Sequence, residues 1–238
     1  MQFLKTANFD WMEMLNFYER PFRAKLVPAK IWEDLDRYKN KPTSFANYFK
    51  KWRTRIEWKD QKSKAKVYDQ YVAVGGEYDP NERQCIIQIY TKRFSVFQFT
   101  EDTWEKFKYK VIQTLQHEMI HFMQYDRRQD ECSGYVLPYK KVKHAKKNEE
   151  RKYLSEFDEI QAYAHCTLLD FKCYKPSFTT DTLISRSRRY RDSRTLYYFL
   201  KAFDFDYRNN HAIPKLMQQI AKWERKYERI VRASRRPK

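Results

Sequence analysis

The stretch EDTWEKFKYKVIQTLQHEMIHFMQY, residues 101–125, predicts one long helix. Its apolar residues recur at three- and four-residue intervals, as they do on one face of a helix, and these are Trp104, Phe107, Val111 and Leu115. Thr100 stands at the position of an N-cap, and the acidic Glu101 and Asp102 suit the positive end of a helix dipole. We therefore expect a helix that ends near Tyr125.

Near the end of this helix, two histidines stand four residues apart, with a glutamate directly after the first. On a helix, residues i and i+4 share one face, so His117 and His121 can bind one ion while Glu118 projects beside them. The alternative is a helix that exposes two unrelated histidines. The flanking residues argue against it because they are uncharged and mostly apolar: Thr114, Leu115, Met119, Ile120, Phe122 and Met123.

A catalytic zinc ion usually has three protein ligands and one open position, so the pattern lacks one ligand. The pattern HExxHxxGxxH is excluded because Gln124 and Arg127 occupy its last two defined positions. His144, in a lysine-rich stretch, is an alternative third ligand and would suit a protease of the DNA-linked SprT type.

The stretch YLSEFDEIQAYA, residues 153–164, offers two further ligands, Glu156 and Glu159. We expect Ser155 to be the N-cap of a helix and Asp158 to take the capping-box position. We prefer Glu159 because Glu156 falls in the first turn, where a carboxylate has a structural role.

Small Ala162 follows Glu159 on the same helix face. The HExxH helix and this later glutamate helix resemble the compact gluzincin-like metallopeptidases over about residues 67–170. The resemblance implies a zinc ion held by His117, His121 and Glu159. It also implies that QCIIQIYT, residues 84–91, is the edge strand beside the substrate cleft. The small size suggests a minimal, phage-type version.

Peptide hydrolysis is the reaction that such a site implies. Zinc lowers the pKa of its bound water to about 7, and we expect Glu118 to take the proton and deliver it to the leaving amine. Tyr163, one turn after Glu159, is the nearest candidate to stabilise the oxyanion. By helical phase, His165 points away and is expected to be a core or surface residue.

The 49 basic and 31 acidic residues give a net charge of +18, which favours acidic partners. Besides a peptide or protein substrate, we therefore expect possible nucleic-acid contact through a basic surface. The competing hypothesis is a basic nucleic-acid-binding or virion-associated structural protein whose zinc site is structural or inactive. A host-targeted toxin with the same zinc chemistry is a third reading, and the oligomeric state stays open.

The expected location is cytoplasmic, or the virion or host cytoplasm for a viral protein. The mean hydropathy is −0.96, no apolar run approaches the roughly 20 residues of a membrane helix, and the first residues lack a signal-peptide pattern. Four cysteines without CxxC spacing are expected to be reduced structural thiols.

The expected fold is α+β: a predominantly helical, zincin-like domain with a small mixed sheet of about three strands beside the HExxH helix. Helices are expected at 10–20, 28–39, 44–59, 156–171, 194–203 and 214–231, and strands at 67–74, 84–91 and 93–99. Residues 126–152 are expected to form a solvated loop or lid. The segments 1–62, 63–175 and 176–238 are expected to form a helical segment, the metallopeptidase core and a helical extension of one compact domain.

Overall fold

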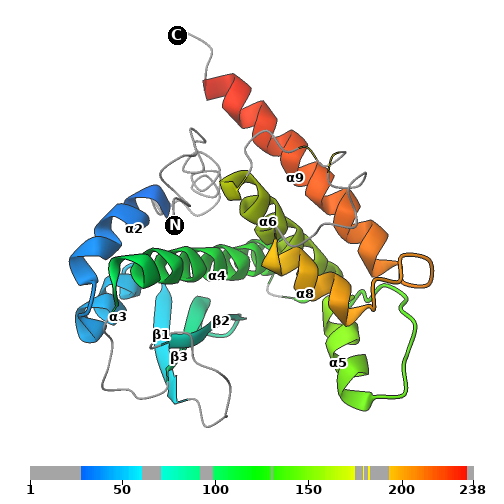
Figure 1. The fold of residues 1–238 in the computed structure, drawn as a ribbon, viewed down its shortest axis with the longest axis horizontal. Coiled ribbons are helices and arrows are strands. Elements are labelled where there is room, and N and C mark those ends of the chain that lie inside the picture. The colour runs from blue at the N-terminus through cyan, green and yellow to red at the C-terminus, as the bar shows by residue number, and fades with distance from the viewer. Residues whose placement is uncertain are drawn as a thin grey trace. The chain divides into compact units, whose positions relative to one another are not determined.

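The computed structural model describes residues 28–60, 71–91, 99–129, 131–174, 179, 182 and 193–234. The fold is α+β and mostly helical with a small mixed sheet (Figure 1), as predicted. Its elements are α2 (Pro28–Leu35), the 3-10 helix η1 (Asp36–Tyr38), α3 (Pro42–Lys50), β1 (Thr54–Asp60), β2 (Tyr71–Asp79), β3 (Gln84–Thr91), α4 (Glu101–Arg127), α5 (Ala145–Leu154), α6 (Phe157–Tyr174), α8 (Arg194–Ala202) and α9 (Ala212–Ser234). The expected helix at 10–20 and, apart from Phe99, the expected strand at 93–99 lie outside the described residues.

The described chain divides into two compact units, one that reaches Gln129 and one that starts at Glu131. This boundary falls inside the segment 63–175, which was expected to form one core. No described helix has both the length and the apolar composition needed to cross a membrane.

The sheet of the first unit has the order β1-β3-β2, with β1 parallel and β2 antiparallel to β3. The expectation that residues 84–91 form the edge strand is therefore wrong, because β3 is the central strand. Cys85, Ile86 and Ile87 are buried in succession, and such a continuous apolar run is typical of a strand covered on both faces. The two outer strands are β1 and β2.

The expected helix at 44–59 ends at Lys50, so its second half was predicted wrongly. Arg53 has a φ of 50°, and the chain then enters β1. From Thr54 to Lys59, apolar or uncharged residues alternate with charged ones, which is the period of a strand. On the charged face of β1, Glu57 pairs with Arg55 and Lys59 at 3.0 and 2.7 Å.

The expected hairpin is present, since β2 and β3 are antiparallel neighbours. Its turn is shorter than the predicted residues 75–83, because β2 continues through Gly75 and Gly76 to Asp79. The carboxylate of Asp79 accepts hydrogen bonds from the backbone N–H groups of Asn81 and Glu82, at 2.9 and 3.2 Å. The two glycines therefore belong to the strand and not to the turn.

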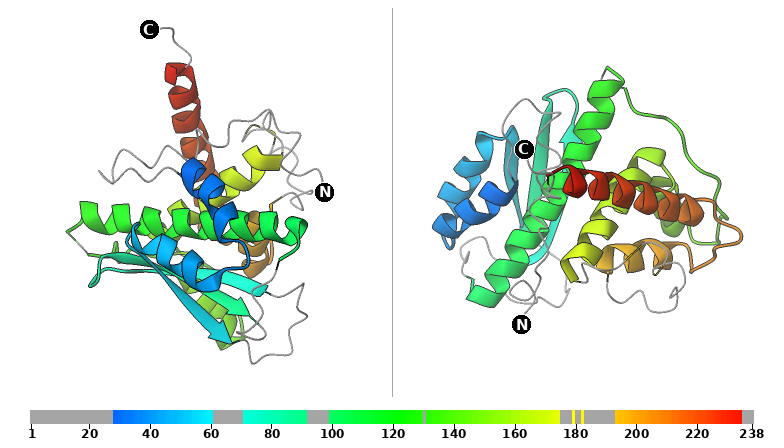
Figure 2. Two further views of the ribbon diagram at one scale, coloured as in Figure 1. Left: turned by 90° about the vertical axis from the view of Figure 1, so that its left-hand side faces the viewer. Right: turned by 90° about the horizontal axis from the view of Figure 1, so that it is seen from above.

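The long helix α4 lies along one face of the sheet (Figures 1 and 2). Thr100 is its N-cap, as predicted, and its hydroxyl accepts a hydrogen bond from the backbone N–H of Thr103 at 3.4 Å. Tyr78 of β2 packs against Phe122 and Tyr125 of α4, with ring centroids 5.5 and 5.4 Å apart. One row of α4 side chains thus faces β2.

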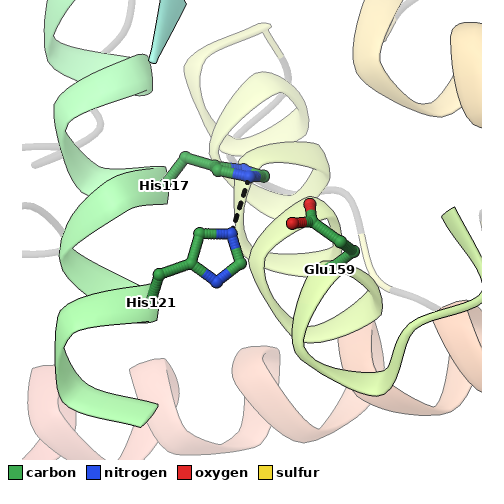
Figure 3. A group of neighbouring side chains, drawn as sticks. All are labelled: His117, His121 and Glu159. Carbon is green, nitrogen blue, oxygen red and sulfur yellow. Dashed lines mark hydrogen bonds between the residues drawn. The ribbon is translucent and has the colours of Figure 1, made fainter. Parts of the chain in front are cut away.

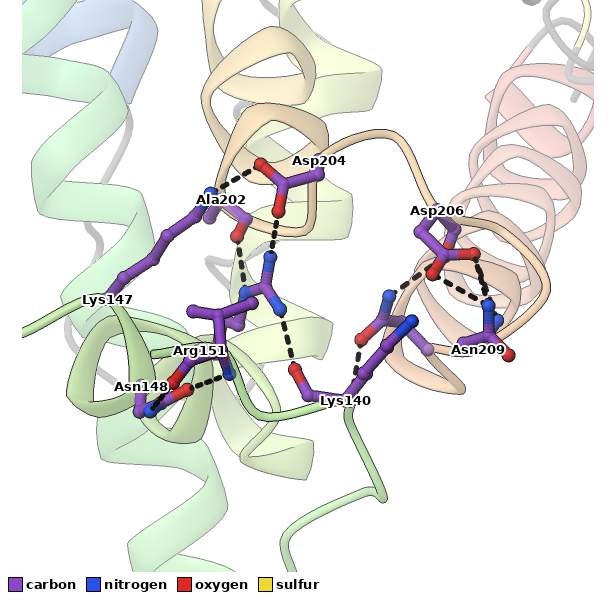
Figure 4. Close-up of polar contacts among 10 residues, drawn as sticks. Lys140, Lys147, Asn148, Arg151, Ala202, Asp204, Asp206 and Asn209 are labelled. Atoms are coloured by element: carbon purple, nitrogen blue, oxygen red, sulfur yellow. Dashed lines mark hydrogen bonds and ion pairs between the residues drawn. The ribbon is translucent and has the colours of Figure 1, made fainter. Parts of the chain in front are cut away.

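The second unit is built from α5, α6, α8 and α9. The solvated loop expected at 126–152 contains α5, so that prediction was wrong in part. Arg151 of α5 is 1% exposed and donates hydrogen bonds to the carbonyls of Ala202 and Lys140 and to the carboxylate of Asp204 (Figure 4). Tertiary contacts at Arg151 therefore fix this polar helix.

Ser155 closes α5 as its C-cap, and α6 begins at Phe157. The prediction that Ser155 is the N-cap of the glutamate helix was therefore wrong, because only two residues separate the two helices. Asp158 accepts a hydrogen bond from the backbone N–H of Ser133 at 3.3 Å.

Helix α9 packs on α6, as expected from its apolar stripe. The indole N–H of Trp223 donates to the carbonyl of Gln161 at 3.1 Å, and Leu216 and Ile220 are fully buried. His165 is 1% exposed and lies edge-on to Trp223 at 5.3 Å. It is a core residue, one of the two expected possibilities.

Candidate metal centre

His117 and His121 lie one turn apart on α4 and present their Nε2 atoms to each other at 3.2 Å. A tetrahedral zinc ion with Zn–N bonds of about 2.0–2.1 Å holds two nitrogen ligands about 3.3–3.4 Å apart. The spacing of the two imidazole nitrogens therefore matches one shared ion. The ring planes are inclined at 76°, so the two imidazoles are not stacked on each other.

Gln124 orients one of these rings. Its Oε1 lies 2.9 Å from Nδ1 of His121, and both side chains are buried. Because an amide oxygen only accepts hydrogen bonds, this contact places the proton on Nδ1 and leaves the Nε2 lone pair for a metal. In the sequence analysis, Gln124 was used only to exclude the pattern HExxHxxGxxH. Its i+3 spacing from His121 was the available signal for this second role.

Glu159 is the third residue of α6 and is 8% exposed. Tyr198 of α8 lies near it in the same unit. Burial raises the pKa of the Tyr198 hydroxyl, and a hydrogen bond with Glu150 and the negative charges of Glu150 and Glu159 raise it further. Tyr198 was not a candidate from sequence, since no pattern links α8 to the glutamate of α6.

His117, His121 and Glu159 form a group whose ligand atoms, one from each residue, all lie within 4.8 Å of one another (Figure 3). Within the described part of the chain, Glu118, Glu156 and His144 lie outside this group. Two imidazoles and one carboxylate are a donor set that zinc accepts in catalytic sites, with the fourth position left for water. The chemistry of these residues therefore fits zinc.

Glu118 lies on the same helix but faces β2. A β-carbon built on Gly76 would stand 2.6 Å from Oε1 of Glu118, so the carboxylate lies directly against that strand. The Glu118 side chain is 4% exposed. Burial raises the pKa of the Cys85 thiol on β3 well above its usual range, and the charge of Glu118 raises it further. Glu118 is thus held against β2 and is not part of the ligand group.

Tyr163, the predicted oxyanion partner, is half-buried on α6. Its ring stacks on that of Tyr198, with centroids 6.2 Å apart and planes at 26°, and contacts Phe199 at 5.9 Å. The structure therefore brings two tyrosines together in the unit that carries Glu159.

No protein-family model, curated protein or solved structure matches this chain. The chemistry of the chain's own residues is therefore the basis for a function.

Proposed function

We propose that this protein is a zinc-dependent metallopeptidase in which His117, His121 and Glu159 bind the metal and Glu118 is the general base. The observation that carries the proposal is the convergence of two imidazole nitrogens and one carboxylate oxygen within 4.8 Å. The match between the 3.2 Å separation of the two nitrogens and tetrahedral zinc supports the choice of metal.

When bound, zinc would supply a Lewis acid for the scissile carbonyl and a water whose pKa is lowered to about 7. Glu118 takes the proton of the attacking water and passes it to the leaving amine. Its place in the sequence directly after His117, and its contact with β2 at Gly76, support this assignment. Gln124 holds the His121 ring in the tautomer that binds metal.

Strand β2 is the proposed binding surface for an extended substrate. It has a neighbouring strand on one side only among the described strands, and Gly76 is exposed. A peptide adds to such an edge through main-chain hydrogen bonds. This role was predicted for residues 84–91, and we now assign it to β2 because β3 is paired on both sides.

Tyr163 remains the proposed oxyanion partner, and Tyr198 joins it as a second candidate because it lies near Glu159. A tyrosine hydroxyl is protonated at neutral pH, as a hydrogen-bond donor must be, and the raised pKa of Tyr198 extends this to higher pH. Replacing each tyrosine with phenylalanine and comparing kcat would distinguish them. The true donor should lose more activity while the zinc content is unchanged.

The direct test combines metal analysis with cleavage of fluorescein-labelled casein and of a mixed peptide pool. We expect one zinc per chain in the wild type, loss of zinc in His117→Ala and weaker zinc binding in Glu159→Gln. Glu118→Gln should keep its zinc and lose about 100- to 10,000-fold in cleavage rate, as expected for removal of a general base.

Glu156→Gln is the matched control, because this neighbouring glutamate lies outside the ligand group. It should keep both zinc and activity. If the wild type binds no zinc, or if Glu118→Gln cleaves at the wild-type rate, the proposal is wrong. Zinc binding without cleavage of either substrate would favour the basic nucleic-acid-binding protein with a structural zinc.

A further inference from the structure

Two adjacent glycines of β2 face opposite sides of the sheet. Gly76 is paired with Ile87 and Tyr78 with Cys85 on β3, and Tyr78 packs against α4. Because side chains alternate along a strand, Gly76 also faces α4. Gly75 faces the other side, where its nearest neighbours are Tyr90 and Gln88.

The space at Gly76 is already filled by α4. An added β-carbon would stand 2.6 Å from both Oε1 of Glu118 and the methyl carbon of Thr114, and 2.8 Å from Cγ of Glu118. Carbon and oxygen atoms that are not bonded make favourable contacts at about 3.5–4.0 Å, so each of these approaches is a severe overlap. The same construction at Gly75 gives ordinary contacts of 3.4 and 4.0 Å.

Position 76 requires glycine because there is no room for a side chain, and not because of its backbone angles. Among the described glycines, only Gly134 has a positive φ, so any residue can adopt the extended backbone of position 76. What only glycine permits is the close approach of a strand to a helix. The α4 side chain that occupies this space is that of Glu118, the proposed base.

We propose that Gly76 is a positioning residue for Glu118: its missing side chain leaves the space in which the Glu118 carboxylate is held against β2. This inference rests on the proposed function for its consequence in catalysis, but the contact itself does not depend on it. The exposed backbone of Gly76 also places the same point of β2 within reach of a bound peptide. One residue thus sets the distance between the base and the substrate strand.

The contact is tested by a double-mutant cycle in EDTA, without metal or substrate. We expect Gly76→Ala to lower the urea midpoint of unfolding, and Gly75→Ala to leave it nearly unchanged. In a Glu118→Ala background, Gly76→Ala should cost clearly less, and in Thr114→Ala/Glu118→Ala the cost should nearly vanish. If Gly76→Ala lowers the midpoint equally with and without the Glu118 side chain, the proposal is overturned.

The consequence is tested on the zinc-loaded protein with fluorescein-labelled casein. Gly76→Ala should keep one zinc per chain and a KM within twofold of the wild type, while kcat falls about 10- to 100-fold through displacement of the base. A change in KM alone would overturn the role of Gly76 in positioning the base. If the wild type cleaves nothing, the proposed function fails, and the cycle in EDTA still decides whether Gly76 holds Glu118.

Discussion

The two ring nitrogens of His121 contact different residues, and the two contacts have different roles. Nε2 points towards His117 and Nδ1 towards Gln124. A neutral imidazole carries its proton on only one nitrogen, so the second contact decides which nitrogen is left for the metal. Residues that orient a ligand in this way affect metal affinity without touching the ion.

We therefore predict that Gln124→Leu weakens zinc binding about 10- to 100-fold, the usual effect of removing such a partner. Competition with a fluorescent zinc chelator measures this change. Gln113→Leu is the matched control, since Gln113 is also a buried glutamine of α4, lies one turn before His117, and has Lys110 as a partner. Equal zinc affinities in the two variants would contradict the orienting role of Gln124.

Some residues of the candidate site could be predicted from the sequence, and others could not. His117, Glu118 and His121 are visible because a helix turns a spacing of four into a shared face. The role of Gly76 is not visible, because it depends on how β2 lies across α4, which no local pattern encodes. Glycines beside a turn signal also predict a turn, and that is why 75–83 was assigned to one.

At the scale of helices and strands, strong periodicity made prediction possible. Helices α4, α8 and α9 and strand β3 lie within a few residues of their expected bounds. Strand β1 was missed because the three- and four-residue spacing of the apolar residues in α3 continues into it, through Trp52 and Ile56. Helix α5 was missed because AKKNEERKYL contains almost no apolar residues, so its amphipathic signal is absent and its contacts are tertiary.

The buried guanidinium of Arg151 makes three of these contacts, with Ala202, Lys140 and Asp204. Replacing it with methionine would leave the carbonyls of Ala202 and Lys140 without this donor, and we predict a loss of about 2–4 kcal/mol in the free energy of unfolding. Urea unfolding measures it. Lys147→Met is the control: Lys147 also pairs with Asp204, but at the surface, and should cost less than about 1 kcal/mol. Similar losses in both variants would show that Arg151 does not fix α5.

The same cluster predicts a pH dependence. A hydrogen bond from Lys147, together with the charges of Lys147 and Arg151, lowers the pKa of the Asp204 carboxyl below its ordinary value of 3.8. The stability that Asp204 contributes is therefore present above about pH 4 and is lost as the pH falls through the lowered pKa. We predict that Asp204→Asn flattens the decline of the thermal midpoint between pH 5 and 3. An unchanged decline would contradict this assignment.

At the scale of the whole molecule, the candidate ligands are divided between the two compact units. His117 and His121 belong to the first and Glu159 to the second. A metal that binds only the folded protein stabilises it by about 2.7 kcal/mol at a concentration 100 times its Kd. We predict that zinc raises the melting temperature of the wild type, and that Glu159→Gln reduces this rise. Differential scanning calorimetry in zinc and in EDTA measures both, and equal rises would exclude Glu159 as a ligand.

The net charge of +18 belongs to the whole chain and predicts a second kind of partner. We expect binding to a labelled 30-base-pair DNA duplex that weakens more than about tenfold between 50 and 200 mM salt, because phosphate contacts release counterions. Fluorescence anisotropy measures this binding. Glu118→Gln should bind as the wild type does. No binding at 50 mM salt, or an affinity insensitive to salt, would contradict nucleic-acid contact.

The split of the ligands between α4 and α6 has a consequence for control of the protein. The proposed base, the two imidazoles and the proposed substrate strand belong to the first unit, and the proposed third ligand, Glu159, belongs to the second. We expect an antibody that binds only the second unit, and displaces α6, to inhibit the proposed peptidase activity without contacting the substrate strand. It would leave the ion with two protein ligands and open to capture by a chelator, while the peptide-binding edge stayed vacant and intact.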